Sequence, residues 1–277
     1  MSSLNRDARR DLPIGMFDSG VGGLTVLDAV RRRMPQEDLL YLGDTARLPY
    51  GTKSGDTITR YALQATRKLV EQQVKMLVVA CNTASSVALP ALQRAYPDIP
   101  VIGVVEHGAE AACKASVSGA IAVMGTTSTT REGAYVRTIL GMRPDARVTG
   151  VATQLLVPMA EEGWFDGPLV EGIIARYLKP VMSRDTPPDC LVLGCTHFPL
   201  LTEAVRAVVG PAVILVDSAA TTAQAVENRL VRDGLARIQP GGSMTFLTTD
   251  DTGRFAATGS LFLRTNLSAG DVRLVDL

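Results

Sequence analysis

The chain of 277 residues has little cysteine, no charge imbalance and no long apolar run. Its four cysteines are Cys81, Cys113, Cys190 and Cys195. So few cysteines in a chain of this length do not form a disulfide framework, which indicates a reducing compartment. No apolar run reaches the roughly 18 residues that a membrane-spanning helix needs. The N-terminal residues MSSLNRDARRDLP lack the apolar stretch of a secretion signal and are typical of a frayed leader. We therefore expect a soluble, cytoplasmic protein.

The charge balance argues against two classes of partner. Lys plus Arg and Asp plus Glu each total 28, so no positive excess favours nucleic acid or an anionic membrane surface. Hydrophobic residues make up 46% of the chain, which is enough for a substantial buried core. The length fits one large domain or two smaller ones.

Strand-like apolar runs alternate with amphipathic helical segments along most of the chain. Predicted strands cover 13–17, 38–42, 76–80, 101–105, 119–124, 148–151, the run before Cys195, 212–216 and 244–248. Predicted helices cover 24–34, 57–74, 85–96, 108–114, 131–140, 169–182, the segment up to 210, and 219–233. Residues 125–130 are predicted to form a turn, and the tail from 237 onward a packing element without chemistry.

This alternation predicts an α/β fold built from parallel sheets. We expect two similar parallel-sheet lobes, one formed by 1–101 plus 219–277 and the other by 102–218. Ligands of such sheets bind at the carboxyl ends of the strands. Asp18, Cys81, Thr126 and Cys195 all fall at predicted strand ends. The active site is therefore expected in the cleft between the two lobes.

Two cysteines occupy matching positions in two similar segments. Residues 77–92 read LVVACNTASSVALPAL and residues 191–201 read LVLGCTHFPLL. In each segment an apolar strand ends at a cysteine, and a polar turn and a helix follow. The positive end of a helix dipole favours a thiolate, so Cys81 and Cys195 are candidate acid–base groups. Cys113, within a helix, and Cys190, at the start of a strand, are better explained as small buried hydrophobes.

Other roles for these cysteines fit less well. The spacing of Cys190, Cys195 and His197 matches no structural zinc site, and the two cysteines should lie about 16 Å apart along one strand. A Cys–His nucleophile pair would leave Cys81 without a role. Inversion at a C–H centre requires proton transfer on both faces of one carbon, and two equivalent cysteines suit that task.

The glycine-rich segment DSGVGG follows the first predicted strand. It lacks the GK[ST] ending of a phosphate-binding P-loop and does not complete GxGxxG in register. We interpret it as a tight turn that brings backbone N–H groups to an anion. Asp18 is either a helix N-cap or a carboxylate beside the site, and the sequence leaves both open.

Taken together, these motifs resemble the cofactor-independent glutamate racemases. The segments that carry the resemblance are IGMFDSGVGGLTVL (14–27), YLGDTARLPYG (41–51), VVACNTAS (78–85), LVPMAEEG (156–163) and LGCTHFPLL (193–201). They span most of residues 14–235. The resemblance implies a two-lobed α/β fold and interconversion of L- and D-glutamate, which supplies D-glutamate for peptidoglycan synthesis.

The resemblance also implies roles for individual residues. Cys81 would handle the proton of D-glutamate, assisted by Asp18. Cys195 would handle the proton of L-glutamate, assisted by Glu161 and His197. The implied substrate contacts are Asp18, Ser19, Tyr50, Gly51, Asn82, Thr83, Thr196 and His197, to which we add Thr126 from its place at a strand end. The implied assembly is a homodimer.

The chain departs from the family pattern at two places. It has Ala152-Thr153-Gln154 where Ala-Cys-Pro is common, which leaves Glu161 or Glu162 open as the assisting carboxylate. It has His107 where a proline is common, and we assign that residue no role.

No cofactor or metal is expected, since none of the five lysines falls in a motif where it would form an aldimine with pyridoxal phosphate. The alternatives are a racemase of aspartate or another amino acid, and a glutamate-binding protein without catalysis.

Overall fold

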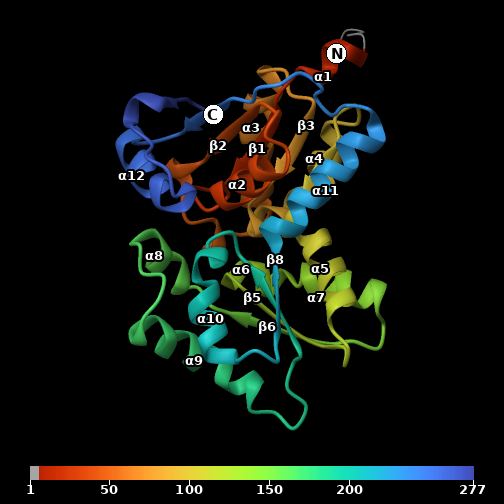
Figure 1. Ribbon diagram of the computed structural model, residues 1–277, viewed down its shortest axis with the longest axis vertical. Coiled ribbons are helices and arrows are strands. Elements are labelled where there is room, and N and C mark those ends of the chain that lie inside the picture. The colour runs from red at the N-terminus through yellow and green to blue at the C-terminus, as the bar shows by residue number, and fades with distance from the viewer. Residues whose placement is uncertain (1–5) are drawn as a thin grey trace.

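Two parallel β-sheets organise residues 6–277, the part of the chain that the computed structural model describes (Figure 1). A six-stranded sheet has the order β10-β9-β2-β1-β3-β4, and a four-stranded sheet has the order β6-β5-β7-β8. The strand pairs in both sheets are parallel. The predicted α/β fold with two parallel-sheet lobes is confirmed.

The strands are β1 Ile14–Asp18, β2 Leu39–Gly43, β3 Met76–Val79, β4 Val101–Gly103, β5 Ala120–Gly125, β6 Arg147–Ala152, β7 Cys190–Gly194, β8 Ile214–Asp217, β9 Met244–Thr248 and β10 Val272–Leu274. The α-helices are α1 Arg6–Arg10, α2 Leu24–Arg33, α3 Gly55–Glu71, α4 Asn82–Ala95, α5 Val104–Ala115, α6 Thr127–Glu132, α7 Ala134–Met142, α8 Leu156–Glu161, α9 Pro168–Met182, α10 Thr202–Val209, α11 Ser218–Asp233 and α12 Thr252–Leu263. Short 3₁₀ helices are η1 Thr45–Arg47, η2 Tyr50–Thr52, η3 Phe198–Leu201 and η4 Ala269–Asp271.

The central strands are buried on both faces. In β1, Ile14 and Met16 pack with α2 and α11 on one face, and Phe17 packs with α3 and α4 on the other. Neighbouring residues of a strand point to opposite faces, so a strand covered on both sides needs a continuous apolar run. The run IGMF meets that requirement, and Asp18 interrupts it only at the carboxyl end.

The domain limits remain a proposal. We propose 1–101 plus 219–277 as one domain and 102–218 as the other. In support, β1 to β4, β9 and β10 form the six-stranded sheet, and β5 to β8 form the four-stranded sheet. Strand β4 runs two residues past the proposed limit at 101. Figure 1 shows the first sheet in the upper half of the molecule and the second in the lower half.

Several predicted boundaries were wrong. Residues 127–132, within and beyond the predicted turn, form α6, because the Thr126 side chain accepts a hydrogen bond from Thr129 N and caps the helix. Helix α5 begins at Val104, where a strand was predicted to continue. Part of the predicted leader forms α1, where Arg9 Nη2 donates to Asp98 O at 3.1 Å, and residues 1–5 lie outside the described part. No helix in the described residues has the length and apolar character to cross a membrane.

A buried ion pair ties together one end of the six-stranded sheet. Lys75 Nζ lies 2.5 Å from Glu37 Oε2, and both side chains are fully buried. Lys75 also donates to Arg10 O at 2.6 Å, and Glu37 Oε1 accepts from Arg237 N at 2.8 Å. Burial lowers the pKa of Lys75, and the Glu37 carboxylate opposes that shift. The pair connects the segment before β3 with the N-terminal helix and the C-terminal tail.

Lys75→Met is expected to destabilise the fold by about 3–5 kcal/mol, because it leaves the Glu37 carboxylate buried without its cation. Urea unfolding measures the loss. Arg67→Met is the control, since its 3.9 Å pair with Glu71 is exposed, and such pairs contribute roughly 1 kcal/mol or less. Equal losses in the two variants would contradict the importance of the buried pair.

Candidate active site

The carboxyl ends of four strands deliver the candidate residues. Asp18 ends β1, Cys81 follows β3, Thr126 follows β5 and Cys195 follows β7. The two cysteines are 4% and 5% exposed, and Asp18 and Thr126 are also buried. Both cysteines therefore lie in an environment of low dielectric, where neighbouring charges act strongly.

Cys81 caps the start of α4. Its sulfur accepts a hydrogen bond from Ala84 N at 3.4 Å and lies 3.5 Å from the Ser19 hydroxyl. Burial, followed by the nearby Asp18 carboxylate, raises the pKa of the Cys81 thiol to about 12. The expectation that the helix start favours a thiolate is wrong for this residue, because burial and a like charge outweigh the N–H groups. Cys81 is a protonated thiol at neutral pH.

Asp18 is a carboxylate beside the site and does not cap α2. The N-cap of α2 is Gly23, and Asp18 Oδ2 instead accepts a hydrogen bond from Gly20 N at 2.9 Å. Burial raises the pKa of Asp18, while the His197 charge and backbone N–H groups pull it down. Of the two roles that the sequence left open for Asp18, the helix N-cap is therefore wrong.

Cys195, His197 and Glu161 form a chain of contacts, which we call the relay. His197 Nδ1 lies 3.6 Å from Cys195 Sγ, and His197 Nε2 lies 3.1 Å from Glu161 Oε1. Burial disfavours the charged ring, but the Cys195 sulfur and the Glu161 carboxylate raise the pKa of His197 to about 10. Glu161 makes the contact with His197, whereas Glu162 is exposed. The histidine is thus an imidazolium at neutral pH.

The turn after Cys195 differs from the expected helix start. His197 is followed by the 3₁₀ helix η3, and the α-helix α10 begins only at Thr202. The positive charge beside the Cys195 sulfur therefore comes from His197 and not from an α-helix dipole. The two cysteine turns look alike in sequence but have opposite electrostatic surroundings.

The DSGVGG turn packs directly on the turn that follows Cys195. A Cβ atom at Gly22 would lie 2.4 Å from Thr196 Oγ1 and 2.5 Å from His197 Nδ1. No side chain fits at that distance, so glycine is required there. The Thr25 hydroxyl also donates to Thr196 O at 2.8 Å. These contacts join the end of β1 in one sheet to the end of β7 in the other.

Tyr135 on α7 contacts the turns of both cysteines, and no sequence motif marked it. Its hydroxyl donates to Asn82 Oδ1 at 2.7 Å, and a Cβ at Gly194 would lie 3.2 Å from its ring. The Asn82 Nδ2 group is buried and finds no acceptor among the described residues. Because a buried donor without a partner is costly, Asn82 offers a hydrogen bond to a bound ligand.

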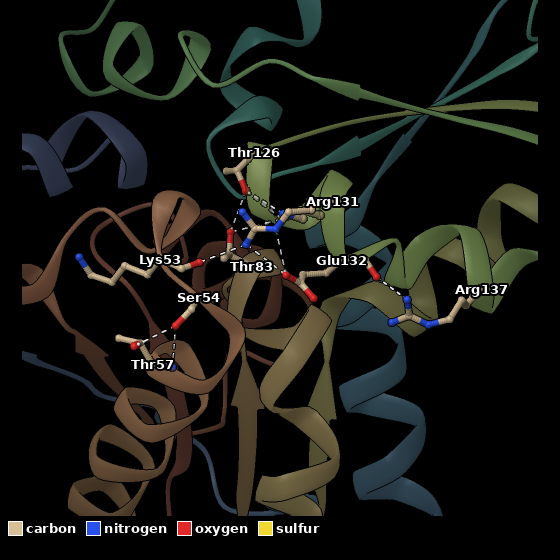
Figure 2. Close-up of polar contacts among 9 residues, drawn as sticks. Lys53, Ser54, Thr57, Thr83, Thr126, Arg131, Glu132 and Arg137 are labelled. Atoms are coloured by element: carbon tan, nitrogen blue, oxygen red, sulfur yellow. Dashed lines mark hydrogen bonds and ion pairs between the residues drawn. The ribbon is translucent and has the colours of Figure 1, made fainter.

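Threonine hydroxyls connect the two halves on the other side of the site. Thr83 Oγ1 lies 3.0 Å from Thr126 Oγ1 and 3.3 Å from Thr129 Oγ1 (Figure 2). Nearby, Arg131 Nη2 donates to Lys53 O at 3.3 Å, which links α6 to the segment after η2. Figure 2 shows both links crossing between α6 and the six-stranded half.

Tyr50 and Gly51 are placed differently from each other. The Tyr50 ring is buried, and its hydroxyl donates to Asp44 Oδ2, so it is committed within the fold. Gly51 packs against Thr126, where a Cβ would lie 3.0 Å from the threonine Cβ. Main-chain atoms of this segment, and not the Tyr50 hydroxyl, therefore face Thr126.

The remaining sequence candidates lie apart from the two cysteine turns. Cys190 is buried at the start of β7, and Cys113 is half-buried in α5. His107 also lies on α5, with its Nδ1 4.0 Å from Glu110 Oε2, beside a cavity of about 730 Å³ between α5 and α11. Among the described residues, no hydrogen bond or ion pair connects any of the three to Cys195, His197 or Glu161.

This chain is similar to known proteins in sequence and in fold. Residues 25–226 match the family model described as Asp/Glu/Hydantoin racemase. A glutamate racemase from Geobacter metallireducens is 46% identical, with 95% of this chain and 96% of the relative aligned. A crystal structure of a glutamate racemase isoform from Bacillus anthracis superposes with a TM-score of 0.91 at 34% identity, covering 97% of this chain and 98% of that chain. A glutamate racemase from Francisella tularensis in complex with D-glutamate has a TM-score of 0.89 at 32% identity, covering 96% and 98%. These matches confirm the resemblance found in the motifs.

The chain contains two histidines, which allows a direct test of the relay. Histidine NMR titration is expected to show His197 charged from pH 7 to 9, with a midpoint near pH 10. Burial lowers the pKa of His107 below its usual 6.5, so the second midpoint should fall on the acid side. The variant His107→Gln assigns the two signals. A midpoint of His197 near pH 6.5 would contradict the relay.

Proposed function

The chain belongs to the Asp/Glu/hydantoin racemase family, and from this premise we propose that it interconverts L- and D-glutamate by proton transfer between two cysteines. Family membership confirms the expected enzyme class, a racemase. Glutamate as the substrate is supported by the relatives, which include glutamate racemases at 40–46% identity over most of the chain. The structure from Francisella tularensis contains D-glutamate.

One observation carries the proposed mechanism, namely the opposite charges beside the two buried cysteines, a carboxylate at Cys81 and an imidazolium at Cys195. Cys81 faces the Asp18 carboxylate and keeps its proton. Cys195 faces the positively charged ring of His197, whose Nδ1 lies 3.6 Å from the sulfur. One thiol that can donate and one thiolate that can accept are what inversion at a C–H centre requires.

In the proposed reaction, L-glutamate binds with its α-carbon between the two sulfurs. The Cys195 thiolate removes the α-proton as the C–H bond breaks, and the electron pair moves into the carboxylate side of the substrate. The Cys81 thiol then donates its proton to the opposite face, which gives D-glutamate. The products of one turnover are a Cys195 thiol and a Cys81 thiolate. D-glutamate reacts in the reverse direction from that state.

The energetic difficulty is the weak acidity of the α-proton. A free thiol has a pKa of about 8.5, far below that of an unactivated α-carbon. Charge that develops on the substrate must therefore be stabilised by preorganised donors in a site that excludes water. The candidates are the Nδ2 group of Asn82, the hydroxyls of Ser19, Thr83, Thr126 and Thr196, and main-chain groups near Gly51. In addition, Asp18 and the pair of Glu161 and His197 hold the protonation states of the thiols.

We also propose that the D-glutamate supplies peptidoglycan synthesis, that the reaction uses no cofactor, that the protein acts in the cytoplasm, and that the active form is a homodimer. The first follows from the substrate. The second rests on the two thiols, which supply both proton transfers by themselves.

Purified protein without added cofactor is expected to racemise L-glutamate, as followed by circular dichroism. Exchange of the α-hydrogen in deuterated water should accompany turnover. The same assay with L-aspartate should give a much lower rate, because the relatives that support the substrate are glutamate racemases. A faster rate with aspartate would reassign the substrate. Binding of glutamate without α-hydrogen exchange would show a binding protein instead of an enzyme.

Cys81→Ser and Cys195→Ser are each expected to lower kcat by about 10²- to 10⁴-fold, because each removes one proton-transfer group. Cys113→Ser is the matched control, since that residue is half-buried in α5 and has no part in the relay. Steady-state rates in both directions measure the effect. Full activity in either of the first two variants would overturn the two-cysteine mechanism.

A further inference from the structure

Helix α12, in the C-terminal tail, is built into the six-stranded half of the molecule. Strand β9 precedes it and pairs with β2. The Phe255 ring packs 6.1 Å from the Tyr41 ring, and a Cβ at Gly259 would lie 3.1 Å from Leu24 Cδ1. Figure 1 shows α12 in the upper half of the molecule, above α8. The position of α12 is therefore set by the sheet that carries Asp18.

The last turn of α12 reaches the catalytic histidine of the other half. The ring centroids of Phe262 and His197 lie 5.2 Å apart, with the ring planes at 87°. Both side chains are buried. This is the edge-to-face geometry that aromatic pairs prefer. The tail, which the sequence predicts to pack without chemistry, thus contacts a residue of the proposed proton relay.

The same helix also faces the partner of His197. Arg254 and Glu161 line a cavity of about 50 Å³ together. The hydrogen bond between His197 and Glu161 raises the pKa of His197 and lowers that of Glu161, and the nearby Arg254 charge lowers the pKa of Glu161 further. Arg254 and Phe262 are two turns apart on α12. Arg254 therefore lies next to Glu161, and Phe262 lies next to His197.

We propose that Phe262 is a positioning residue that holds the His197 ring in the orientation required to serve Cys195. The proposal rests on the proposed function, because it concerns the relay that serves the L-glutamate side. His197 makes one contact through each ring nitrogen, to Cys195 and to Glu161. The Gly22 turn packs against its Cε1 and Nδ1 atoms, and Phe262 supplies the aromatic contact.

The contact matters because the relay depends on both ring nitrogens at once. A small rotation of the His197 ring lengthens two distances at once. One joins Nδ1 to the Cys195 sulfur, and the other joins Nε2 to the Glu161 carboxylate. Misplacement of a reacting group by about 1 Å can cost roughly 10²-fold in rate. Phe262 does not touch the reacting atoms, so its effect on catalysis passes through His197.

The test compares Phe262→Leu with the wild type. We expect kcat from L- to D-glutamate to fall about 10-fold, the upper range for loss of an aromatic pair, with KM within about twofold. The pKa of His197, measured by NMR, should fall from about 10 toward 6.5, because its contacts with Cys195 and Glu161 are then less populated. Asp18 is the other acidic group that acts on this ring, and it is unchanged in the variant.

Two further variants separate positioning from packing. Phe262→Tyr keeps the ring, and a cavity of about 500 Å³ borders this residue, so near wild-type kcat and His197 pKa are expected. Phe246→Leu removes an aromatic ring from the same core cluster without touching His197. It should lower stability but leave the pKa of His197 in place.

The proposal is overturned if Phe262→Leu leaves the pKa of His197 unchanged and lowers kcat no more than Phe246→Leu does. A Tyr variant as impaired as the Leu variant would also overturn it. If Phe262→Leu does not fold, Phe262→Met retains most of the side-chain volume and is measured in the same way. The NMR readout needs no turnover, so a wild type without racemase activity would refute the proposed function and leave the positioning of His197 to be judged separately.

Discussion

The close approach of the Gly22 turn to Thr196 and His197 is the contact on which the site depends. It allows the loop after β1 and the loop after β7 to touch without an intervening side chain. The Thr25 hydroxyl fixes this junction through the Thr196 carbonyl. Asp18 and Cys195 belong to different sheets, and this junction lets the charges of Asp18 and His197 act on one another. The junction thus joins the turn of Asp18, whose charge acts on Cys81, to the turn of Cys195.

Two turns of similar sequence acquire opposite electrostatics from their neighbours. Each cysteine follows a buried parallel strand, and each is shielded from water. At Cys81, burial and the Asp18 carboxylate both favour the neutral thiol. At Cys195, the buried imidazolium of His197 supplies a positive charge, and Glu161 in turn stabilises that imidazolium. The two sulfurs therefore face charges of opposite sign, a carboxylate at Cys81 and an imidazolium at Cys195.

Much of this arrangement could be predicted from the sequence, because strand ends and turns are local features. The runs before Asp18, Cys81 and Cys195 are continuous and apolar, and a polar residue ends each of them. The helix at 127–132 could not be predicted in that way, since its Thr- and Ser-rich sequence has low helix propensity and depends on the Thr126 cap. The pKa of Cys81 was also out of reach, because burial and the distance to Asp18 are properties of the folded chain. Tyr135 carries no motif and is recognised only by its contact with Asn82.

The contacts of the C-terminal tail were even harder to predict from the sequence. Its contact between Phe262 and His197 joins residues that are distant in sequence, so no local pattern indicates it. Cys81 and Cys195 are both buried, and several contacts join the two halves of the molecule around them. They include the contacts of Thr25 with Thr196, Thr83 with Thr126, and Phe262 with His197. The last of these also orients the relay. The contact of Phe262 with His197 therefore has two consequences, because it joins the two halves and also bears on the ring that contacts Cys195 and Glu161.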